Sequence, residues 1–264
     1  MGIEIIRDVL YGHGGNVPLL LDIYRPRAAP RTTMPSLVWL HGGAWRAGDR
    51  SDVPELVRTL ARHGYFVVSC DYRLSGHASF PAQIHDVKAI PRWLHAHAST
   101  YGLDQERIAA AGPSAGAHLA ALLGTSADMP ELEGNSGWAE YSSTVQAVVA
   151  LSPPIDALLD PPNLPVGDNA WEQLIGGRLA DHPALVRMSN PTTYLTLHSP
   201  PFLILHGTND EIIPIRHPEA LARSLREADA FVTYLPIDGG THDSDTLLAA
   251  EHEAAVIDFL TRAT

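Results

Sequence analysis

The stretch RIAAAGPSAGAHLAALL, residues 107–123, decides the fold. It begins as a short apolar run typical of a buried strand and ends as an apolar helical pattern. Between the two lies GPSAG, residues 112–116, which has the G-x-S-x-G pattern of a sharp strand-to-helix turn. Such a turn holds its serine in a strained conformation above the edge of a sheet, and the helix start directs N–H groups toward negative charge. This context predicts that Ser114 is a nucleophile.

Short β-branched runs alternate with longer helical patterns on both sides of this stretch, which predicts a mostly parallel sheet with helices on both faces. Residues 3–10 and 18–24 flank the turn-forming GHGGN, so an antiparallel hairpin is expected to open the sheet of about eight strands. Further strands are predicted at SLVWLH, YFVVSCDY, RIAAAG, VQAVVALS, PFLILHG and FVTYLP. Helices are predicted near 51–63, 82–98, 114–127, 216–229 and 244–262.

One segment, from about 153 to 200, departs from this alternation. Its prolines cluster in DPPNLPVGDN, and only a weak helical pattern follows. Long insertions without clear periodicity are usually functional or disordered. We therefore expect one α/β domain over residues 1–264, with a small cap inserted at about 153–200.

Composition narrows the function classes. Lysine and arginine total 18 against 30 acidic residues, and no dense basic run is present, so nucleic acid and anionic membranes are not expected as partners. The amino terminus has an acid and an arginine where a signal peptide needs an uninterrupted apolar stretch, which favours a cytoplasmic location. The composition leaves a homodimer open.

Two further motifs follow predicted strands. HGGAW, residues 41–45, comes directly after SLVWL, and its glycines allow the backbone to approach a substrate oxygen closely. A loop at this position supplies oxyanion-hole N–H groups, together with the residue after the nucleophile. We expect the backbone N–H groups of Gly43, Ala44 and Ala115 to act in this way.

The remaining motifs supply an acid and a base. HGTND, residues 206–210, ends one predicted strand, and GGTHD, residues 239–243, follows the next. The order Ser114, Asp210, His242 is the order of nucleophile, acid and base that G-x-S-x-G hydrolases use. Two nearby acids, Glu211 and Asp238, compete with Asp210 for the acidic role.

Together these motifs resemble those of esterases of the α/β-hydrolase superfamily, close to the hormone-sensitive-lipase-like and bacterial feruloyl-esterase-like (BD-FAE) groups. The similarity covers nearly the whole chain and includes DYRLSGHASFPAQIHDV, residues 71–87. It implies an α/β-hydrolase fold, a triad of Ser114, Asp210 and His242, and no cofactor. Two positions depart from the family pattern: alanine replaces the third glycine of HGGG, and Pro113 fills the first variable position of the serine motif.

The resemblance implies a serine carboxylesterase that hydrolyses small to medium esters through an acyl-enzyme. An arylformamidase or other amidase with the same triad remains an alternative. A third possibility is a non-hydrolytic member of the fold that binds a ligand or acts as an isomerase or cyclase, because fold alone does not determine chemistry.

Several other residues have competing interpretations. The pair His95 and His97 does not share a helix face and has no metal-ligand spacing, so no metal site is predicted. The lone Cys70 is expected in the core. The tryptophans at 45, 138 and 171 are candidates for the substrate pocket, with core packing as an equal contender. Arg73 and Asp86 are expected to pair and brace a loop, and His118 to pack near the serine turn.

Overall fold

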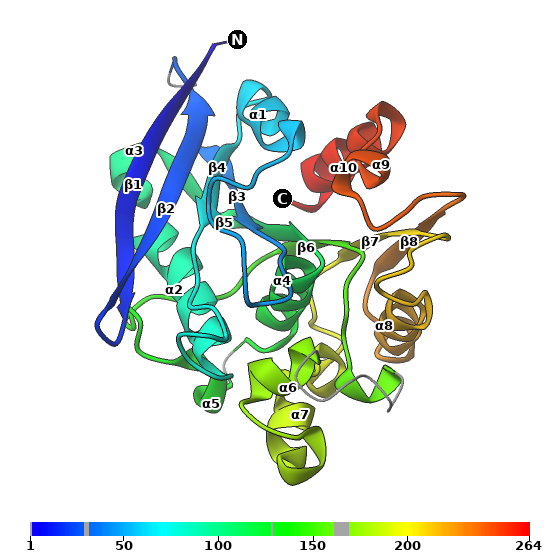
Figure 1. The fold of residues 1–264 in the computed structure, drawn as a ribbon. Coiled ribbons are helices and arrows are strands. Elements are labelled where there is room, and N and C mark those ends of the chain that lie inside the picture. Colours follow the sequence, from blue (N-terminus) through cyan, green and yellow to red (C-terminus); the bar gives the residue numbers. More distant parts are fainter. Residues whose placement is uncertain (1, 29–31, 128, 161–168) are drawn as a thin grey trace.

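The computed structural model describes residues 2–28, 32–127, 129–160 and 169–264 (Figure 1). Within these residues one sheet has the strand order β1-β2-β4-β3-β5-β6-β7-β8. The strands are β1 Ile3–Gly14, β2 Val17–Pro26, β3 Met34–Leu40, β4 Phe66–Cys70, β5 Leu103–Pro113, β6 Ala147–Leu151, β7 Phe202–Gly207 and β8 Val232–Ile237. The α-helices are α1 Glu55–Arg62, α2 Ala82–Ala96, α3 Ala98–Tyr101, α4 Ala115–Thr125, α5 Pro130–Glu133, α6 Ala170–Ile175, α7 Pro183–Ser189, α8 Arg216–Glu227, α9 Ser244–Leu247 and α10 Ala250–Ala263.

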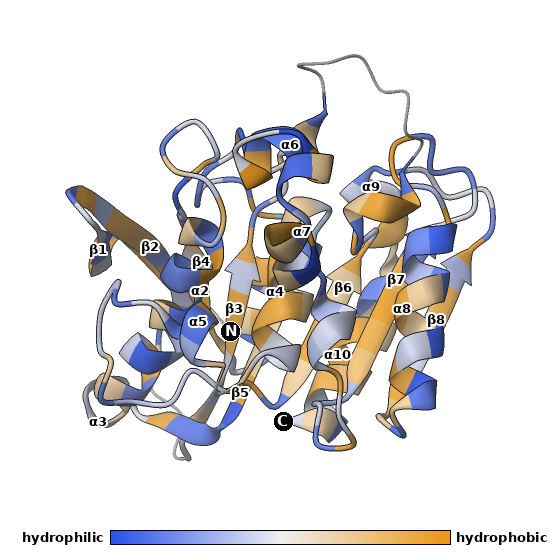
Figure 2. Ribbon diagram, turned by 90° about the horizontal axis from the view of Figure 1, so that it is seen from below, coloured by the Kyte–Doolittle hydropathy of each residue, from blue (hydrophilic) through white to orange (hydrophobic). Residues whose placement is uncertain are grey.

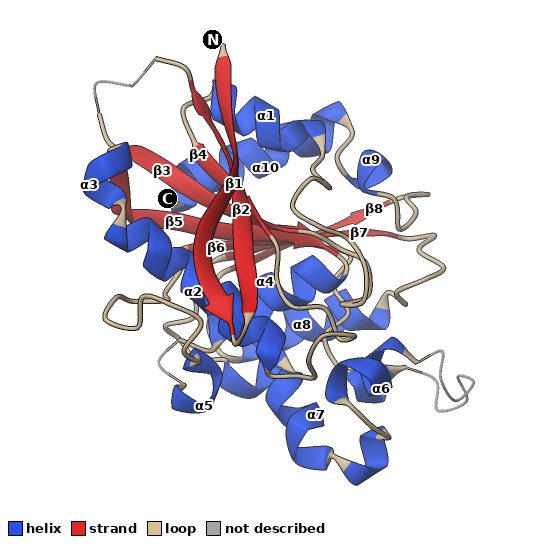
Figure 3. Ribbon diagram, turned by 60° about the vertical axis from the view of Figure 1, so that its left-hand side comes forward, coloured by secondary structure: helices blue, strands red, loops and turns tan. Residues whose placement is uncertain are grey.

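The sheet begins antiparallel and continues parallel, as the sequence predicts. Strand β1 pairs with β2, and β2 with β4, in antiparallel register. The five remaining pairs, from β4–β3 to β7–β8, are all parallel. The long β1–β2 hairpin forms one edge of the sheet (Figure 3). The predicted hairpin and the mostly parallel sheet are therefore confirmed.

Helices cover both faces of the sheet because alternate residues of its inner strands are apolar on opposite sides. In β5, Ile108 and Ala110 belong to a core cluster shared with α2, α4 and α8. Ala109 and Ala111 belong to a second cluster shared with α1 and α10. Figure 2 shows that the inner strands β6 and β7 are mostly hydrophobic, whereas much of α8 is hydrophilic. The buried Cys70 lies in the first cluster, as expected.

The carboxyl-terminal helical region differs from its prediction. The sequence predicts one helix near 244–262, but the structure has α9 and α10 with an extended residue, Ala249, between them (φ −52°, ψ 153°). Leu247, Val256 and Leu260 from these two helices are fully buried in the second cluster. Within the described residues, no helix combines the length and the hydrophobicity that a bilayer crossing requires.

The region predicted as a cap is described in part. Besides α6 and α7 it contains three short 3-10 helices, Ala157–Leu159, Leu179–Asp181 and Pro191–Tyr194. Helices α6 and α7 lie next to each other (Figures 1 and 3). Residues 161–168, which contain most of the proline cluster, lie outside the described residues.

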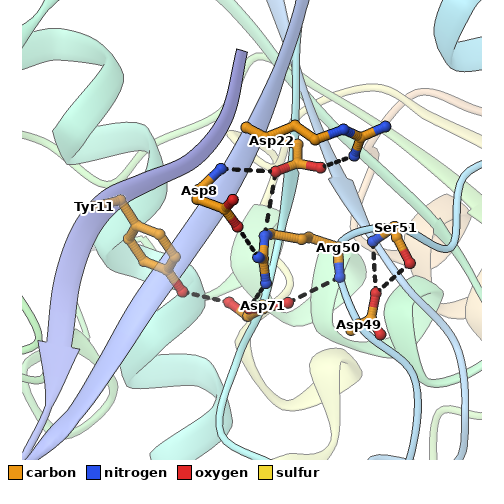
Figure 4. Close-up of polar contacts among 8 residues, drawn as sticks. Asp8, Tyr11, Asp22, Asp49, Arg50, Ser51 and Asp71 are labelled. Carbon is orange, nitrogen blue, oxygen red and sulfur yellow. Dashed lines mark hydrogen bonds and ion pairs between the residues drawn. The ribbon is translucent and has the colours of Figure 1, made fainter. Parts of the chain in front are cut away.

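A network of charges fastens the β1–β2 hairpin to the loop after β3 (Figure 4). Arg50, in that loop, donates from Nη1 to Asp71 Oδ2 at 2.6 Å and from Nε to Asp22 Oδ1 at 3.2 Å, and it also contacts Asp8. Its backbone N–H donates to Asp71 Oδ1 at 2.8 Å. Asp22 is only 2% exposed and pairs in addition with Arg7. The network therefore holds the far end of the loop that begins with HGGAW.

We expect Arg50→Met to lower the free energy of unfolding by about 2 kcal/mol, because Asp22 and Asp71 then lose a charged partner while they remain partly buried. Urea unfolding checks this. Arg262→Met is the matched control, since the Arg262–Asp258 pair is largely exposed and its loss should cost less than about 0.5 kcal/mol. Equal costs for the two variants would contradict a stabilising role for Arg50.

Candidate active site

Ser114 lies in a strained turn between β5 and α4. Its backbone has φ 53° and ψ −120°, a combination that a non-glycine residue rarely adopts. Hydrogen bonds on both sides hold this conformation: the Ser114 N–H donates to the Leu151 carbonyl at 2.8 Å, and the Ser114 carbonyl accepts from the His118 N–H at 3.0 Å. The serine is thus presented at the carboxyl end of β5, as the G-x-S-x-G pattern predicts.

The two glycines of this motif allow the turn to pack directly on the end of β3. A Cβ atom on Gly112 would lie 2.3 Å from the Leu40 carbonyl oxygen, and one on Gly116 would lie 2.1 Å from the same atom. Both distances are impossible for real side chains, and backbone atoms cannot move aside as a flexible side chain can. Glycine at both positions therefore brings Ser114 next to the HGGAW loop.

The HGGAW loop is tightly coiled. Gly43, Ala44 and Trp45 all have positive φ, at 99°, 53° and 59°. The Gly43 carbonyl accepts hydrogen bonds from the N–H groups of Arg46 and Ala47, both at 3.0 Å. A Cβ atom on Gly43 would lie 2.2 Å from the Ala47 carbonyl oxygen, so this position requires glycine.

The alanine that replaces the family's third glycine is accommodated here. Ala44 adopts its positive φ and still carries a backbone N–H. Ala44 lines the same cavities as Ser114. The N–H of Ala115 has no acceptor within α4, because it stands at the first position of that helix. The structure thus brings Gly43, Ala44 and Ala115 beside Ser114, the arrangement expected for binding an oxyanion.

Asp210 and His242 meet at the carboxyl ends of β7 and β8. His242 Nδ1 donates to Asp210 Oδ2 at 2.8 Å, which leaves Nε2 free of that contact. The two loops can approach because Gly207 has no side chain: a Cβ there would lie 2.2 Å from the Gly240 carbonyl oxygen. The competing acids, Glu211 and Asp238, are exposed, whereas the Asp210 side chain is 1% exposed. Of the three acids the structure pairs Asp210 with His242.

The Asp210 carboxylate is fully engaged. Burial alone would raise its pKa, but the bond from His242 and the N–H of Ile213 outweigh this, and the pKa falls to about 2. Oδ1 accepts from the backbone N–H groups of Ile212 and Ile213 at 2.9 and 2.8 Å. Asp210 is therefore ionised at neutral pH, with Oδ2 directed at His242.

His206, which the HGTND motif contains, supports the same loop. It is fully buried, and its Nε2–H donates to the Ile213 carbonyl at 3.0 Å, so it fixes the residue whose N–H binds Asp210. Burial lowers the pKa of His206. The ring is 3.7 Å from Asp210 Oδ2, farther than that of His242. No role is predicted for this histidine from its motif, because only the fold places it against residue 213.

Two cavities meet at Ser114. The larger, of about 620 Å³, is also lined by His242 and by the polar residues Arg46, Asp52 and Asp243. The smaller, of about 350 Å³, lies on the side of Trp45 and Trp171 and is more apolar.

The structure separates the three candidate tryptophans. Trp45 and Trp171 line the smaller cavity, with ring centroids 4.5 Å apart. Trp138 lies elsewhere: its indole donates to the Tyr11 carbonyl at 2.8 Å and packs edge-on against His97. The expectation that Trp138 belongs to the pocket is therefore corrected, because the chain before β6 carries it toward the β1–β2 hairpin rather than toward Ser114.

The expected pairs and packing contacts are present. Arg73 donates to both oxygens of the buried Asp86, at 2.8 and 2.7 Å. His118 is buried one turn after Ser114, as predicted. Among the described residues, no group of three or more histidine, cysteine, aspartate or glutamate side chains is arranged to hold a metal ion.

Two residues near the smaller cavity were not found from the sequence. Asp160 accepts from Trp171 Nε1 at 2.8 Å and from His217 Nε2 at 2.9 Å. They are 57 residues apart, and neither stands in a recognisable motif. No spacing signal could have joined them.

The sequence is similar to those of known esterases. The family model described as BD-FAE matches residues 21–225. The chain belongs to this family. It is 34% identical to the esterase LipQ of Mycobacterium tuberculosis over 96% of its own length, and 34% identical to LipC of the same organism over 91%. It spans about three fifths of the length of these two relatives, 61% and 60%.

Solved structures of esterases share the fold. A truncated carbohydrate esterase from gut microbiota superposes with a TM-score of 0.89 at 26% identity, covering 98% of this chain and 96% of the other. A bifunctional GH43-CE protein of Bacteroides eggerthii gives 0.88 at 34% identity, over 98% of this chain and 35% of that one. Propionate-bound esterase 2 of Thermogutta terrifontis gives 0.81 at 25% identity, over 99% and 94%. The BD-FAE member described here thus has the α/β-hydrolase fold.

We expect Gly116→Ala to lower the free energy of unfolding by about 1–3 kcal/mol, because the added Cβ collides with the Leu40 carbonyl. Helix propensity alone would predict a gain of roughly 1 kcal/mol, so the sign of the change decides between the two effects. Gly76→Ala is the control, since a Cβ there meets no atom within 4 Å. Urea unfolding of both variants measures the difference, and a stabilised Gly116→Ala would refute the steric constraint.

The lowered pKa of Asp210 predicts that the stability of the protein depends on pH. The pKa of this carboxyl is depressed in the folded state, so its stabilising contribution is complete above the unfolded pKa near 4 and is lost as the pH falls toward 2. Between pH 5 and pH 3 the stability advantage of the wild type over Asp210→Asn should shrink by about 1 kcal/mol. Denaturant unfolding of both proteins at the two pH values tests this, and a constant difference would be inconsistent with a depressed pKa.

Proposed function

We propose that the chain is a serine carboxylesterase that hydrolyses small to medium esters through an acyl-enzyme. The observation that carries the proposal is the strained Ser114 in one cavity with His242, whose Nδ1 is held by a buried, ionised Asp210. Membership of the BD-FAE family and the similarity to the mycobacterial esterases support the same conclusion.

In the proposed reaction, Ser114 Oγ attacks the ester carbonyl while His242 Nε2 accepts the hydroxyl proton. The Asp210 carboxylate keeps His242 in the tautomer with a free Nε2 and stabilises the imidazolium that forms. Backbone N–H groups of Gly43, Ala44 and Ala115 receive the developing oxyanion, and each such donor contributes about 3 kcal/mol to the transition state.

The second half of the reaction uses the same groups. His242 returns its proton to the departing alcohol, which leaves the acyl group on Ser114. A water molecule, deprotonated by His242, then attacks the acyl-enzyme and releases the acid. No cofactor takes part in this scheme.

Ser114→Ala should lower kcat for p-nitrophenyl acetate by about 10⁴-fold or more, and Asp210→Asn by roughly 10⁴-fold, because the triad acts as a unit. The exposed Ser142 provides a control, and Ser142→Ala should retain wild-type kcat. Initial rates and labelling by a fluorophosphonate measure both effects. An active, folded Ser114→Ala variant would overturn the proposal, and faster cleavage of a matched anilide than of the ester would favour the amidase alternative.

A further inference from the structure

We propose that the smaller cavity at Ser114 binds the acyl group of the substrate, and that Trp171, held in place by Asp160 and His217, limits the length of the acyl chain. This inference rests on the proposed esterase function and deepens it. The substrate class that follows is a short acyl group on a larger, more polar alcohol.

The position of His242 distinguishes the two cavities. The alcohol must take its proton from His242, so it leaves on the side of Ser114 that His242 lines. That side is the larger cavity, which is also lined by Asp52 and Asp243, whereas Arg46 lines both cavities. The smaller cavity is lined by Ser114, Ala44 and Ala115 but not by His242. The acyl group, which stays on Ser114, therefore belongs in the smaller cavity.

The lining of the smaller cavity is mainly aromatic and apolar, and it also includes the polar residues Arg46, Asp160, Asn169 and Glu211. Trp45 and Trp171 stand side by side with ring planes inclined at 47°, and Pro154, Ile213 and Pro214 contribute to the apolar lining. Both tryptophans are almost completely buried, at 2% and 3% exposed. An acyl chain that extends from Ser114 into this cavity meets their rings.

Trp171 is fixed by a chain of hydrogen bonds that the proposed chemistry does not use. Its indole Nε1–H donates to Asp160 Oδ2 at 2.8 Å, and His217 Nε2–H donates to Asp160 Oδ1 at 2.9 Å. His217 Nδ1 in turn accepts from the backbone N–H of Ile155 at 3.2 Å. Because His217 is fully buried and Ile155 follows β6 closely, these hydrogen bonds anchor the Trp171 ring to the sheet.

A second buried histidine fixes Trp45 in a similar way. The Trp45 indole Nε1–H donates to His118 Nδ1 at 3.2 Å, and His118 Nε2–H donates to the Ser189 carbonyl at 2.7 Å. Burial lowers the pKa of His118 to about 4, so it remains a neutral acceptor at neutral pH. The His118 ring also contacts Trp171 edge-on, with centroids 5.2 Å apart. Both rings of the wall are therefore locked, and a locked wall rejects long chains instead of adapting to them.

The test is the acyl-chain profile of kcat/KM for p-nitrophenyl esters from acetate to octanoate. In Trp171→Ala the optimum should move to longer chains, and each further methylene that becomes buried should raise kcat/KM by about four-fold relative to the wild type. Trp138→Ala is the matched control, because it removes the same side chain away from Ser114, and its profile should equal that of the wild type.

A second variant, Asp160→Asn, leaves both tryptophan side chains of the wall in place. Asp160→Asn loses one acceptor, so it cannot serve both Trp171 and His217, and it should broaden the profile by a smaller factor than Trp171→Ala. This variant keeps the proposal testable if Trp171→Ala does not fold. Neither substitution should change the order of preference among acetate esters of different alcohols.

These assays distinguish a failure of the acyl-wall assignment from a failure of the esterase function. A folded wild type that cleaves no ester contradicts the proposed function. A wild type that cleaves esters, with a chain-length profile unchanged in both folded variants, overturns only the assignment of the acyl wall. A changed preference among the alcohols with an unchanged acyl profile also overturns it, because the smaller cavity would then hold the alcohol.

Discussion

The close approach of the serine turn to the end of β3 is the constraint on which the site depends. Leu40's carbonyl oxygen occupies the space where side chains of residues 112 and 116 would otherwise lie. This contact joins the strand that carries Ser114 to the loop that carries Gly43 and Ala44. Without it, the proposed nucleophile and the proposed oxyanion donors would stand apart, however well each was formed locally.

A similar contact joins Asp210 to His242, the proposed acid and base. Gly207 lets the loop after β7 lie against the loop after β8, and the Asn209 N–H donates to the Gly240 carbonyl at 2.9 Å. The backbone of the Asp210 loop then saturates one carboxylate oxygen and leaves the other for His242. In both places glycine is required because backbone meets backbone, and hydrogen bonds across the contact hold the geometry.

The histidines divide into separate roles that follow from burial and partners. His242 is partly exposed and lines the larger cavity, as its proposed role of exchanging protons with substrate requires. His118, His206 and His217 are fully buried. Each of them holds a neighbouring element through a hydrogen bond from its ring. At His118 and His217 one ring nitrogen donates and the other accepts, so each of these two rings satisfies two partners at once.

The sequence by itself determined the order of strands and helices, the strained serine, and the residues proposed as triad and oxyanion donors. These features are local: a strand, a tight turn and a helix start each have their own residue pattern. Only the tertiary structure decided that Asp210, rather than Glu211 or Asp238, meets His242, and that Trp138 lies away from Ser114. It also brought Asp160 into hydrogen-bond contact with both Trp171 and His217. Such contacts join residues far apart in the chain, and no periodicity encodes which distant side chains will share one buried space.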